Sequence, residues 1–404
     1  MNQPTAIDPA LRALLHGSAL APLRLGDREL LPVVQGGMGV GVSAHRLAGS
    51  VAALGGVGTL SSVDLRRHHP DLMERTRGLG VGPDAKAAIN GANLVALERE
   101  IALARRLSGG FGMLAMNVMR AVSDYAAYVQ RSLECGIDAV VVGAGLPLDL
   151  PELAADHPKA RLIPILSDAR GVQLVLRKWE RRKRLPDAVV LEHPGHAGGH
   201  LGAASVADVS DPRFDFDRVV PQTLEVLRAA GVERQVPVIA AGGIRSLHDI
   251  RRLQSLGAAA VQLGTPFAVT VECDADPAFK RVLAEARDED MVEFTSVAGL
   301  PARAVLTPWL KAYLKAEPRL QAVAHVKARC TKVFDCLAQC GLRDGKAGWG
   351  QFCIDQQLAA AMKGDLQRGL FFRGRGALPF GDQIRSVREL MERLLGGVVP
   401  AAAA

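Results

Sequence analysis

Aromatic residues are scarce in this chain: tryptophan, tyrosine and phenylalanine make up 4% of its 404 residues, whereas hydrophobic residues of all kinds reach 49%. A core must therefore be built mainly from alanine, valine, leucine and glycine, and this composition excludes a disordered or collagen-like chain. No uncharged apolar run approaches the roughly 18 residues that a membrane helix needs. The first residues, MNQPTAIDPALRALLHG, also lack a basic segment followed by an apolar one. These absences predict a cytoplasmic protein without a membrane partner.

Neither sign of charge is in large excess. Lysine and arginine total 49 against 42 aspartate and glutamate residues, which leaves a net charge of +7. A surplus of this size favours solubility and the attraction of anionic small molecules. The densest basic stretch, residues 177–184, is interpreted as the solvated end of a helix. We therefore expect a small-molecule substrate and no nucleic-acid partner.

Cysteine is uncommon too, and the six residues are expected to be reduced thiols because no export signal precedes them. Four form the series Cys330-x5-Cys336-x3-Cys340-x12-Cys353, in which no Cys-x2-Cys pair occurs. Four thiolates can hold an iron–sulfur cluster or zinc. However, Cys336 and Cys340 would also share one face of a helix, and buried free thiols are the favoured interpretation. No metal is predicted, and the cluster stays an open alternative.

Eight short apolar runs recur along the chain, separated by segments with apolar residues at helical spacing. The runs are continuous rather than alternating, as expected of parallel strands that are covered on both faces. Eight strand–helix units within about 250 residues predict a (β/α)8 barrel, a TIM barrel, because a doubly wound sheet usually has about five or six strands. The runs are residues 32–35, 57–61, 112–117, 138–143, 162–167, 188–192, 236–241 and 259–264.

Three regions are predicted along the sequence. Residues 1–30 are an N-terminal extension, residues 31–271 are the barrel, and residues 272–404 are an appended helical region. The stretch 62–111, after the second strand, is long for a barrel connection and contains a predicted helix near 93–107. We interpret it as an insertion that forms a lid or a wall, because it follows a strand at the end where barrels keep their active sites.

The loops after the strands hold the candidate binding residues. A glycine-rich loop after the first strand lets a flat ligand or a phosphate approach the backbone closely. Glycines after strands seven and eight occupy the position where barrels commonly hold a phosphate, through backbone N–H groups and a helix N-terminus. Tight packing turns are the alternative interpretation of all these glycines. The residues are Gln35, Gly36, Gly37 and Met38 in the first loop, and Gly242, Gly243, Gly264 and Thr265 in the later ones.

The sixth strand is followed by the most unusual stretch, in which three histidines stand among four glycines. Histidine accepts or holds a proton near neutral pH, which suits acid–base chemistry. The three imidazoles of His193, His196 and His200 also suggest zinc. Pro194 and the glycines make a helix improbable here, however, so the helical face that would present two ligands is not expected to form.

In their order, these residues resemble the nitronate monooxygenases, formerly called 2-nitropropane dioxygenases. The resemblance spans roughly residues 30 to 305, and its short motifs are specific in combination. They are Gln35-Gly36-Gly37-Met38, Asn117 at the end of the third strand, Ala197-Gly198-Gly199-His200-Leu201-Gly202, Ala241-Gly242-Gly243-Ile244, Leu263-Gly264-Thr265 and Pro301-Ala302-Arg303-Ala304.

The resemblance implies non-covalently bound FMN and no metal. Gly242, Gly243, Gly264 and Thr265 would bind the phosphate, and the residues from Gln35 to Met38 would line the isoalloxazine and ribityl side together with Asn117. Gly198 and Gly199 would let their loop pass close to the flavin. His200 matches the family's catalytic histidine, which acts as a base or stabilises an anionic substrate. The alternative for His200 is a structural loop histidine.

The resemblance implies oxidation of alkyl nitronates with O2 to carbonyl compounds and nitrite. Related flavoproteins are NAD(P)H-dependent reductases of quinones or enoyl thioesters, and they are the first alternative. The chain has His196 where the family often has glutamate, which leaves the substrate open. A flavin-free lyase or isomerase that binds a phosphate-sugar is the second alternative. The segments 371–374 and 378–381 either close over the flavin edge or belong to the core and a turn.

Overall fold

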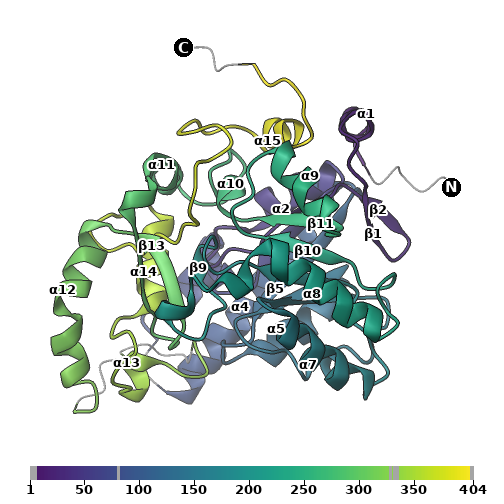
Figure 1. Ribbon diagram of the computed structural model, residues 1–404. Coiled ribbons are helices and arrows are strands. Elements are labelled where there is room, and N and C mark those ends of the chain that lie inside the picture. Colours follow the sequence, from purple (N-terminus) through teal and green to yellow (C-terminus); the bar gives the residue numbers. More distant parts are fainter. Residues whose placement is uncertain (1–6, 80–81, 327–329, 331–335, 401–404) are drawn as a thin grey trace.

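A closed barrel of eight parallel strands forms the centre of the molecule in the computed structural model, which describes residues 7–79, 82–326, 330 and 336–400 (Figure 1). Neighbouring strands follow the order β10-β11-β3-β4-β5-β6-β7-β8. Each strand coincides with one of the eight predicted runs, so the predicted TIM barrel is confirmed. The strands are β3 (Val33–Gln35), β4 (Val57–Ser61), β5 (Met113–Met119), β6 (Ala139–Gly143), β7 (Arg161–Leu166), β8 (Val189–Glu192), β10 (Val238–Ala241) and β11 (Ala260–Leu263).

The barrel strands are apolar on both faces, and this explains their continuous sequence pattern. In β6, Val141 faces the barrel interior, whereas Val140 and Val142 pack outward against the helices. Among the described residues, the strands fill the interior with alanine, valine and isoleucine side chains and with Met113, and no aromatic ring belongs to this cluster. Small side chains are therefore sufficient to fill the barrel, in agreement with the scarcity of aromatics.

The N-terminal extension covers the end of the barrel at which the strands begin. It contains α1 (Pro9–Gly17) and a hairpin of β1 (Leu23–Leu25) and β2 (Arg28–Leu30), in which Leu23 pairs with Leu30. The side chains of Leu23, Leu25 and Leu30 are buried in the same cluster as the barrel interior. The opposite end, where the strands finish, is left for the site.

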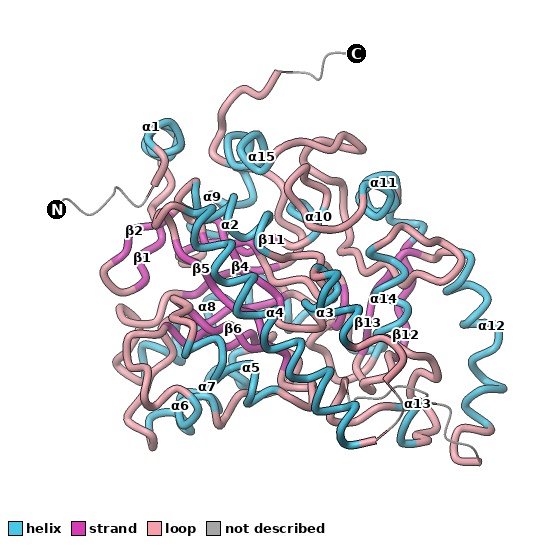
Figure 2. Tube along the Cα trace, turned by 180° about the vertical axis from the view of Figure 1, so that it is seen from behind, coloured by secondary structure: helices cyan, strands magenta, loops and turns pink. Residues whose placement is uncertain are grey.

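Helices surround the barrel, as the view from behind shows (Figure 2). The long helix α4 packs along α2 (His45–Ala53) and begins at Pro83, well before the predicted start near residue 93. It is therefore the regular helix between the second and third barrel strands, and only residues 62–82 are additional. The helices of this part are α2, α3 (Pro70–Arg75), α4 (Pro83–Ser108), α5 (Tyr125–Glu134), α6 (Leu150–Leu153), α7 (Ala169–Glu180), α8 (Phe216–Ala229), α9 (Leu247–Ser255) and α10 (Thr265–Ala268).

Much of the C-terminal region lies against one side of the barrel mouth, whereas α15 (Val387–Leu394) packs against α1, α2 and α9 (Figure 1). The prediction that this region is entirely helical is wrong for residues 291–305, because β12 (Met291–Thr295) and β13 (Pro301–Val305) form an antiparallel sheet with β9 (Gly199–His200). The helices are α11 (Pro277–Glu285), α12 (Pro308–Ala322), α13 (Gly341–Asp344), α14 (Ile354–Met362) and α15 (Val387–Leu394), and short 3-10 turns cover 65–68, 206–208, 212–214 and 288–290.

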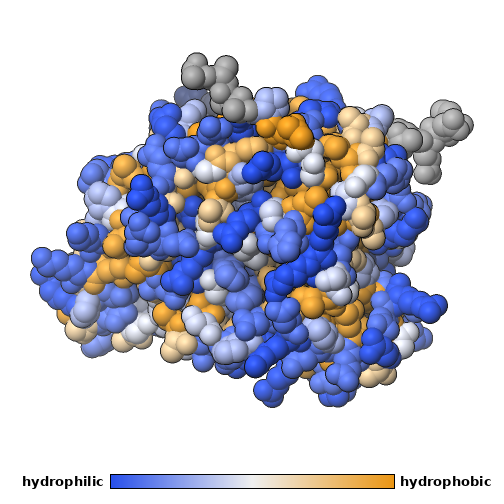
Figure 3. Space-filling model, turned by 45° about the horizontal axis from the view of Figure 1, so that its top comes forward, coloured by the Kyte–Doolittle hydropathy of each residue, from blue (hydrophilic) through white to orange (hydrophobic). Residues whose placement is uncertain are grey.

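The surface mixes hydrophilic and hydrophobic residues on the face that Figure 3 shows. Among the residues that the structure describes, no helix is both long enough and apolar enough to cross a bilayer.

Candidate active site

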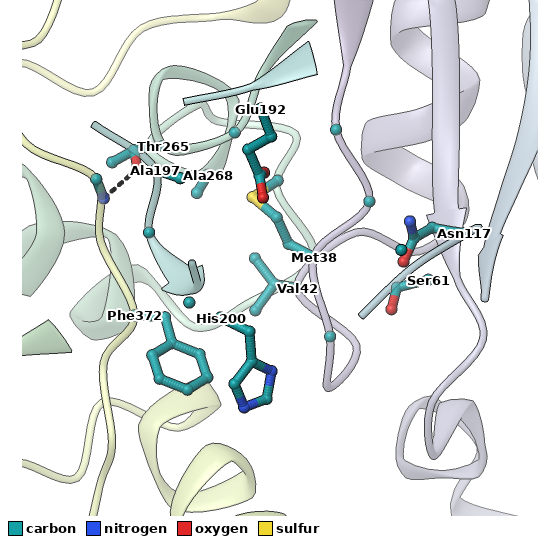
Figure 4. A pocket seen from close by; sticks show the side chains of 18 of the residues that line it. Met38, Val42, Ser61, Asn117, Glu192, Ala197, His200, Thr265, Ala268 and Phe372 are labelled. Carbon is teal, nitrogen blue, oxygen red and sulfur yellow. Dashed lines mark hydrogen bonds between the residues drawn. The ribbon is translucent and has the colours of Figure 1, made fainter. Parts of the chain in front are cut away.

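A cavity of about 290 Å³ lies at the carboxyl ends of the barrel strands. It gathers the predicted site residues from distant parts of the sequence, and each of them except Gln35 lines its wall. Figure 4 shows His200 beside Phe372 at one end, and Asn117 with Ser61 on another side. The lining residues among those predicted are Gly36, Gly37, Met38, Asn117, Gly198, Gly199, His200, Gly242, Gly243, Gly264 and Thr265.

The side chain of Gln35, which was predicted to line the cofactor site, does not line the cavity. Gln35 is completely buried, and its Oε1 accepts a hydrogen bond of 2.7 Å from the backbone N–H of Thr59. Its Nε2 donates to the carbonyl oxygen of Thr59 at 3.1 Å. The amide is therefore engaged in joining strands β3 and β4, and the cavity wall begins one residue later, at Gly36.

The loop after β10 forms a narrow backbone cradle. Gly242 and Gly243 have φ angles of +106° and +75°, a region that side chains other than glycine rarely adopt. A Cβ atom on Gly243 would lie only 2.9 Å from Cγ of His196. Thr265 begins α10 beside this loop, and its Oγ1 accepts a hydrogen bond of 3.0 Å from the N–H of Gly374 (Figure 4). This end of the cavity can accept a phosphate group.

Positive charge surrounds the cradle. The side chains of Arg245 and Arg375 line the cavity, and Arg375 lies 3.3 Å from a carboxylate oxygen of Glu293. Burial, the neighbouring His193 and these arginines lower the pKa of His196 to about 4. His196 is therefore neutral at pH 7, and the positive charge of this rim comes from the guanidinium groups.

Two polar side chains face the cavity from the ends of strands. Asn117 lies in β5, and Glu192 is the last residue of β8. Burial raises the pKa of Glu192 to about 7, so this carboxyl group exchanges a proton near neutral pH. In the described part of the chain, neither side chain has a hydrogen bond to another residue. Both are therefore available to a polar ligand.

His200 is held in place by the C-terminal hairpin. Its Nε2 lies 2.9 Å from Oγ of Ser296, which also accepts a hydrogen bond of 3.2 Å from the N–H of Ala298. The ring of Phe372 lies 5.8 Å away, centroid to centroid. Burial lowers the pKa of His200 to about 4, so the imidazole is neutral at physiological pH.

This pKa makes the stability of the protein depend on pH. The pKa of His200 is near 4 in the folded state and 6.5 in the reference state, so unfolding takes up a proton as the pH falls below 6.5. We expect the lowered pKa of His200 to reduce the free energy of unfolding by about 2 kcal/mol when the pH falls from 7 to 5. Urea unfolding of the wild type and of His200→Asn at both pH values measures this difference. An identical pH dependence in the two proteins would contradict the lowered pKa.

The Pro301–Ala304 motif and the histidine loop form one structural unit. Ala302 of β13 pairs with His200, and Arg303 pairs with Gly199. The completely buried Arg303 lies 2.7 Å from Glu293 and donates a hydrogen bond to the carbonyl oxygen of Ala197. Arg303 therefore fixes the backbone that presents His200 to the cavity.

Replacement of Arg303 by methionine should destabilise the protein by about 3–5 kcal/mol, because Glu293 would lose the main partner of its charge in a buried setting. Urea unfolding measures the loss. Arg287→Met is the matched control, since Arg287 and its neighbour Glu289 are both largely exposed and their pair should contribute less than about 1 kcal/mol. Equal losses in the two variants would contradict the role of Arg303.

The C-terminal segment around residues 372–378 forms part of the cavity wall. A Cβ atom on Gly198 would lie 2.4 Å from the carbonyl carbon of Arg373, so Gly198 is required where this segment crosses the histidine loop. Of the two neighbouring phenylalanines, Phe371 is buried in the core and stacks on Phe279, whereas Phe372 faces the cavity. Phe371 therefore belongs to the core, and closure of Phe372 over a flavin edge stays a prediction.

The sequence interpretation missed several residues at the site. Glu192 could have been found as the end of the sixth strand, a position that places its side chain at the barrel mouth. Arg245 could have been found in the same way, because it directly follows the motif that contains Gly242 and Gly243. Ser296 and Arg375 carry no such signal, since the hairpin and the C-terminal segment were not expected there. Among the described residues, no group of three or more histidine, cysteine, aspartate or glutamate side chains is arranged to hold a metal ion.

Comparison with known proteins agrees with this geometry. The family model described as nitronate monooxygenase matches residues 28–397. The chain belongs to the nitronate monooxygenase family. A curated relative, the probable nitronate monooxygenase of Bacillus subtilis (strain 168), is 28% identical over 292 residues, which are 69% of this chain and 78% of the relative.

Solved structures share the fold of this family member. FabK from Thermotoga maritima is 21% identical, with a TM-score of 0.62, and the match covers 96% of this chain and 95% of that one. Nitroalkane oxidase from Streptomyces ansochromogenes is 20% identical, with a TM-score of 0.61, over 94% and 96% of the two chains. The family assignment makes this chain an oxidoreductase and leaves no need for the lyase or isomerase alternative.

Proposed function

We propose that this oxidoreductase is an FMN-dependent nitronate monooxygenase, which oxidises alkyl nitronates with O2 to carbonyl compounds and nitrite. The observation that carries the proposal is a single cavity with a glycine cradle at one end and a neutral histidine, His200, on its wall. The family membership supports this choice of reaction.

The residues of the cavity fit FMN. The backbone N–H groups of Gly242, Gly243 and Gly264, with Thr265, would hold the phosphate, and Arg245 supplies positive charge beside them. Asn117 and Glu192 offer hydrogen bonds to the polar edge of a ring system or to ribityl hydroxyl groups. When bound there, FMN supplies the electron transfer from the nitronate to O2.

His200 acts on the substrate in this proposal. A neutral imidazole donates a hydrogen bond from one ring nitrogen and accepts one at the other, and Ser296 engages Nε2. The remaining nitrogen can meet an anionic nitronate oxygen without bringing a second charge into the cavity. Phe372 covers the same end of the cavity and limits the access of water to the imidazole.

Steady-state assays with propionate 3-nitronate test the proposal. We expect consumption of O2 and release of nitrite by the purified, FMN-loaded protein without a nicotinamide. NADPH oxidation with a quinone or an enoyl thioester, in the absence of any nitrite release from the nitronate, would instead support the reductase alternative.

A further inference from the structure

The cavity beside His200 continues along an apolar surface from the C-terminal region. The ring of Phe372, which lies beside His200 (Figure 4), packs against the hydrophobic cluster of that region. Other members of the same cluster line the same cavity, and together we call them the apolar wall. The apolar wall consists of Cys336, Leu337, Ile354, Leu358, Leu370 and Phe372.

Helix α14 presents one face to the cavity. Ile354 and Leu358 are four residues apart, so they lie one turn apart on the same side of the helix, and both line the cavity. The N–H of Leu370 donates a hydrogen bond of 3.0 Å to the carbonyl oxygen of Gln357, which fixes the segment of Phe372 along this helix. The face is therefore held in place by backbone contacts.

Leu337 extends the apolar wall to the barrel. It forms a β-bridge with Val122, which also lines the cavity. This segment is not helical, so Cys336 and Cys340 do not share a helix face as their spacing suggested. Burial raises the pKa of Cys336, and its thiol therefore adds no charge to the wall.

The carboxylate beside this wall is already paired with a cation. Asp355 of α14 lines the cavity, and its Oδ2 accepts a hydrogen bond of 3.0 Å from Arg67. Arg67 also lies 2.5 Å from Asp64, and Arg66 lies 2.8 Å from the same carboxylate. Two carboxylates thus balance two guanidinium groups, and neither arginine lines the cavity.

Positive charge is confined to the other end of the cavity. Within the described part of the chain, the arginine and lysine side chains that line it are Arg245 and Arg375. Arg245 follows Gly243 of the cradle by two residues, and the N–H of Arg375 donates a hydrogen bond of 3.0 Å to the carbonyl oxygen of His196. A carboxylate placed along the apolar wall would lose its hydration without gaining a cation, whereas an alkyl group there would be favourably removed from water.

We propose that the substrate carries an uncharged apolar substituent, which lies along the apolar wall, and that Leu337, Ile354 and Leu358 select against nitronates with a second negative charge. This inference rests on the proposed function, in which His200 meets the nitronate oxygen. Propionate 3-nitronate is then still oxidised, but less efficiently than a neutral nitronate of the same shape.

Two nitronates of similar shape test this selection. Propionate 3-nitronate has a carboxylate where 3-methylbutyl nitronate has a neutral branched end. We expect kcat/KM for nitrite release to be at least about tenfold higher for 3-methylbutyl nitronate. Equal values, or a preference for propionate 3-nitronate, would overturn the inference and leave the proposed function in place. Nitrite from neither compound would contradict the proposed function instead.

Binding without turnover gives a second readout. A carboxylate has the planar, anionic shape of a nitronate group, so 4-methylpentanoate and succinate imitate the two nitronates. Calorimetric titration of the FMN-loaded protein should give a Kd at least about tenfold lower for 4-methylpentanoate than for succinate. Equal or tighter binding of succinate would overturn the inference, whether or not a nitronate is oxidised.

Leu358→Arg should shift the selection toward the second charge, because it places a cation on the apolar wall at a half-buried position. We expect the ratio of the succinate Kd to the 4-methylpentanoate Kd to fall at least about tenfold. Gln356→Arg adds the same charge to an exposed position of the same helix, outside the cavity lining, and should keep the wild-type ratio. Circular dichroism and the thermal midpoint show whether each variant is folded. A folded Leu358→Arg variant with the wild-type ratio would show that the substituent does not lie on this wall.

Discussion

His200→Asn should leave a yellow, folded flavoprotein whose kcat with a nitronate is at least about 100-fold lower, because general acid–base or hydrogen-bond catalysis by one positioned side chain is usually worth about that much. Asparagine keeps polarity and much of the volume, so the contact with Ser296 and the packing against Phe372 are largely retained. What is lost is the second ring nitrogen that faces the substrate. Nitrite release and the flavin absorbance together measure the effect.

The matched control is His248→Asn, since His248 is an exposed residue of α9 that does not line the cavity. This variant should retain the wild-type kcat. Wild-type turnover in His200→Asn, at full flavin content, would show that His200 has only a structural role in its loop.

Gly243→Asp should yield a folded protein without flavin. The position has a φ angle of +75°, and a Cβ atom there would approach the ring of His196 to 2.9 Å. The carboxylate would also stand where the FMN phosphate is proposed to bind, and such a juxtaposition of like charges costs several kcal/mol. We therefore expect the Kd for FMN to rise by more than about 100-fold, as measured by titration of the apoprotein.

Gly231→Asp separates backbone strain from the loss of the binding site. Gly231 has a similar φ angle of +72°, but a Cβ atom there would meet open space. It lies after α8, outside the residues that line the cavity. The Gly231→Asp variant should keep its FMN. Full FMN occupancy in Gly243→Asp would contradict the proposed position of the phosphate.

The barrel could be predicted because its signal is local. Each strand is a short apolar run, because both of its faces are buried. Val141, for example, is buried on the inner face. The strands β12 and β13 escaped prediction because β13 pairs with Gly199 and His200, about a hundred residues away, and the surrounding helices dominated the pattern. The start of α4 was missed for a different reason, since its first turns are polar and small.

The site was predictable where backbone geometry determines the residue. The pair Gly242 and Gly243 follows a strand and needs positive φ angles, so its glycines are visible in the sequence. Gln35 belonged to the same kind of motif, yet its side-chain amide forms hydrogen bonds with the backbone of the adjoining strand. Ser296 and Phe372 reach the cavity from the C-terminal region, and their place depends on tertiary packing that no short motif encodes.

The most direct test of the proposed function is an anaerobic titration of the purified, FMN-loaded protein, followed by flavin absorbance. Propionate 3-nitronate is added to one sample and NADH or NADPH to another. We predict rapid loss of the oxidised-flavin absorbance with the nitronate and no comparable change with either nicotinamide. Rapid bleaching by a nicotinamide, with an unchanged spectrum in the presence of the nitronate, would contradict a monooxygenase and identify a reductase.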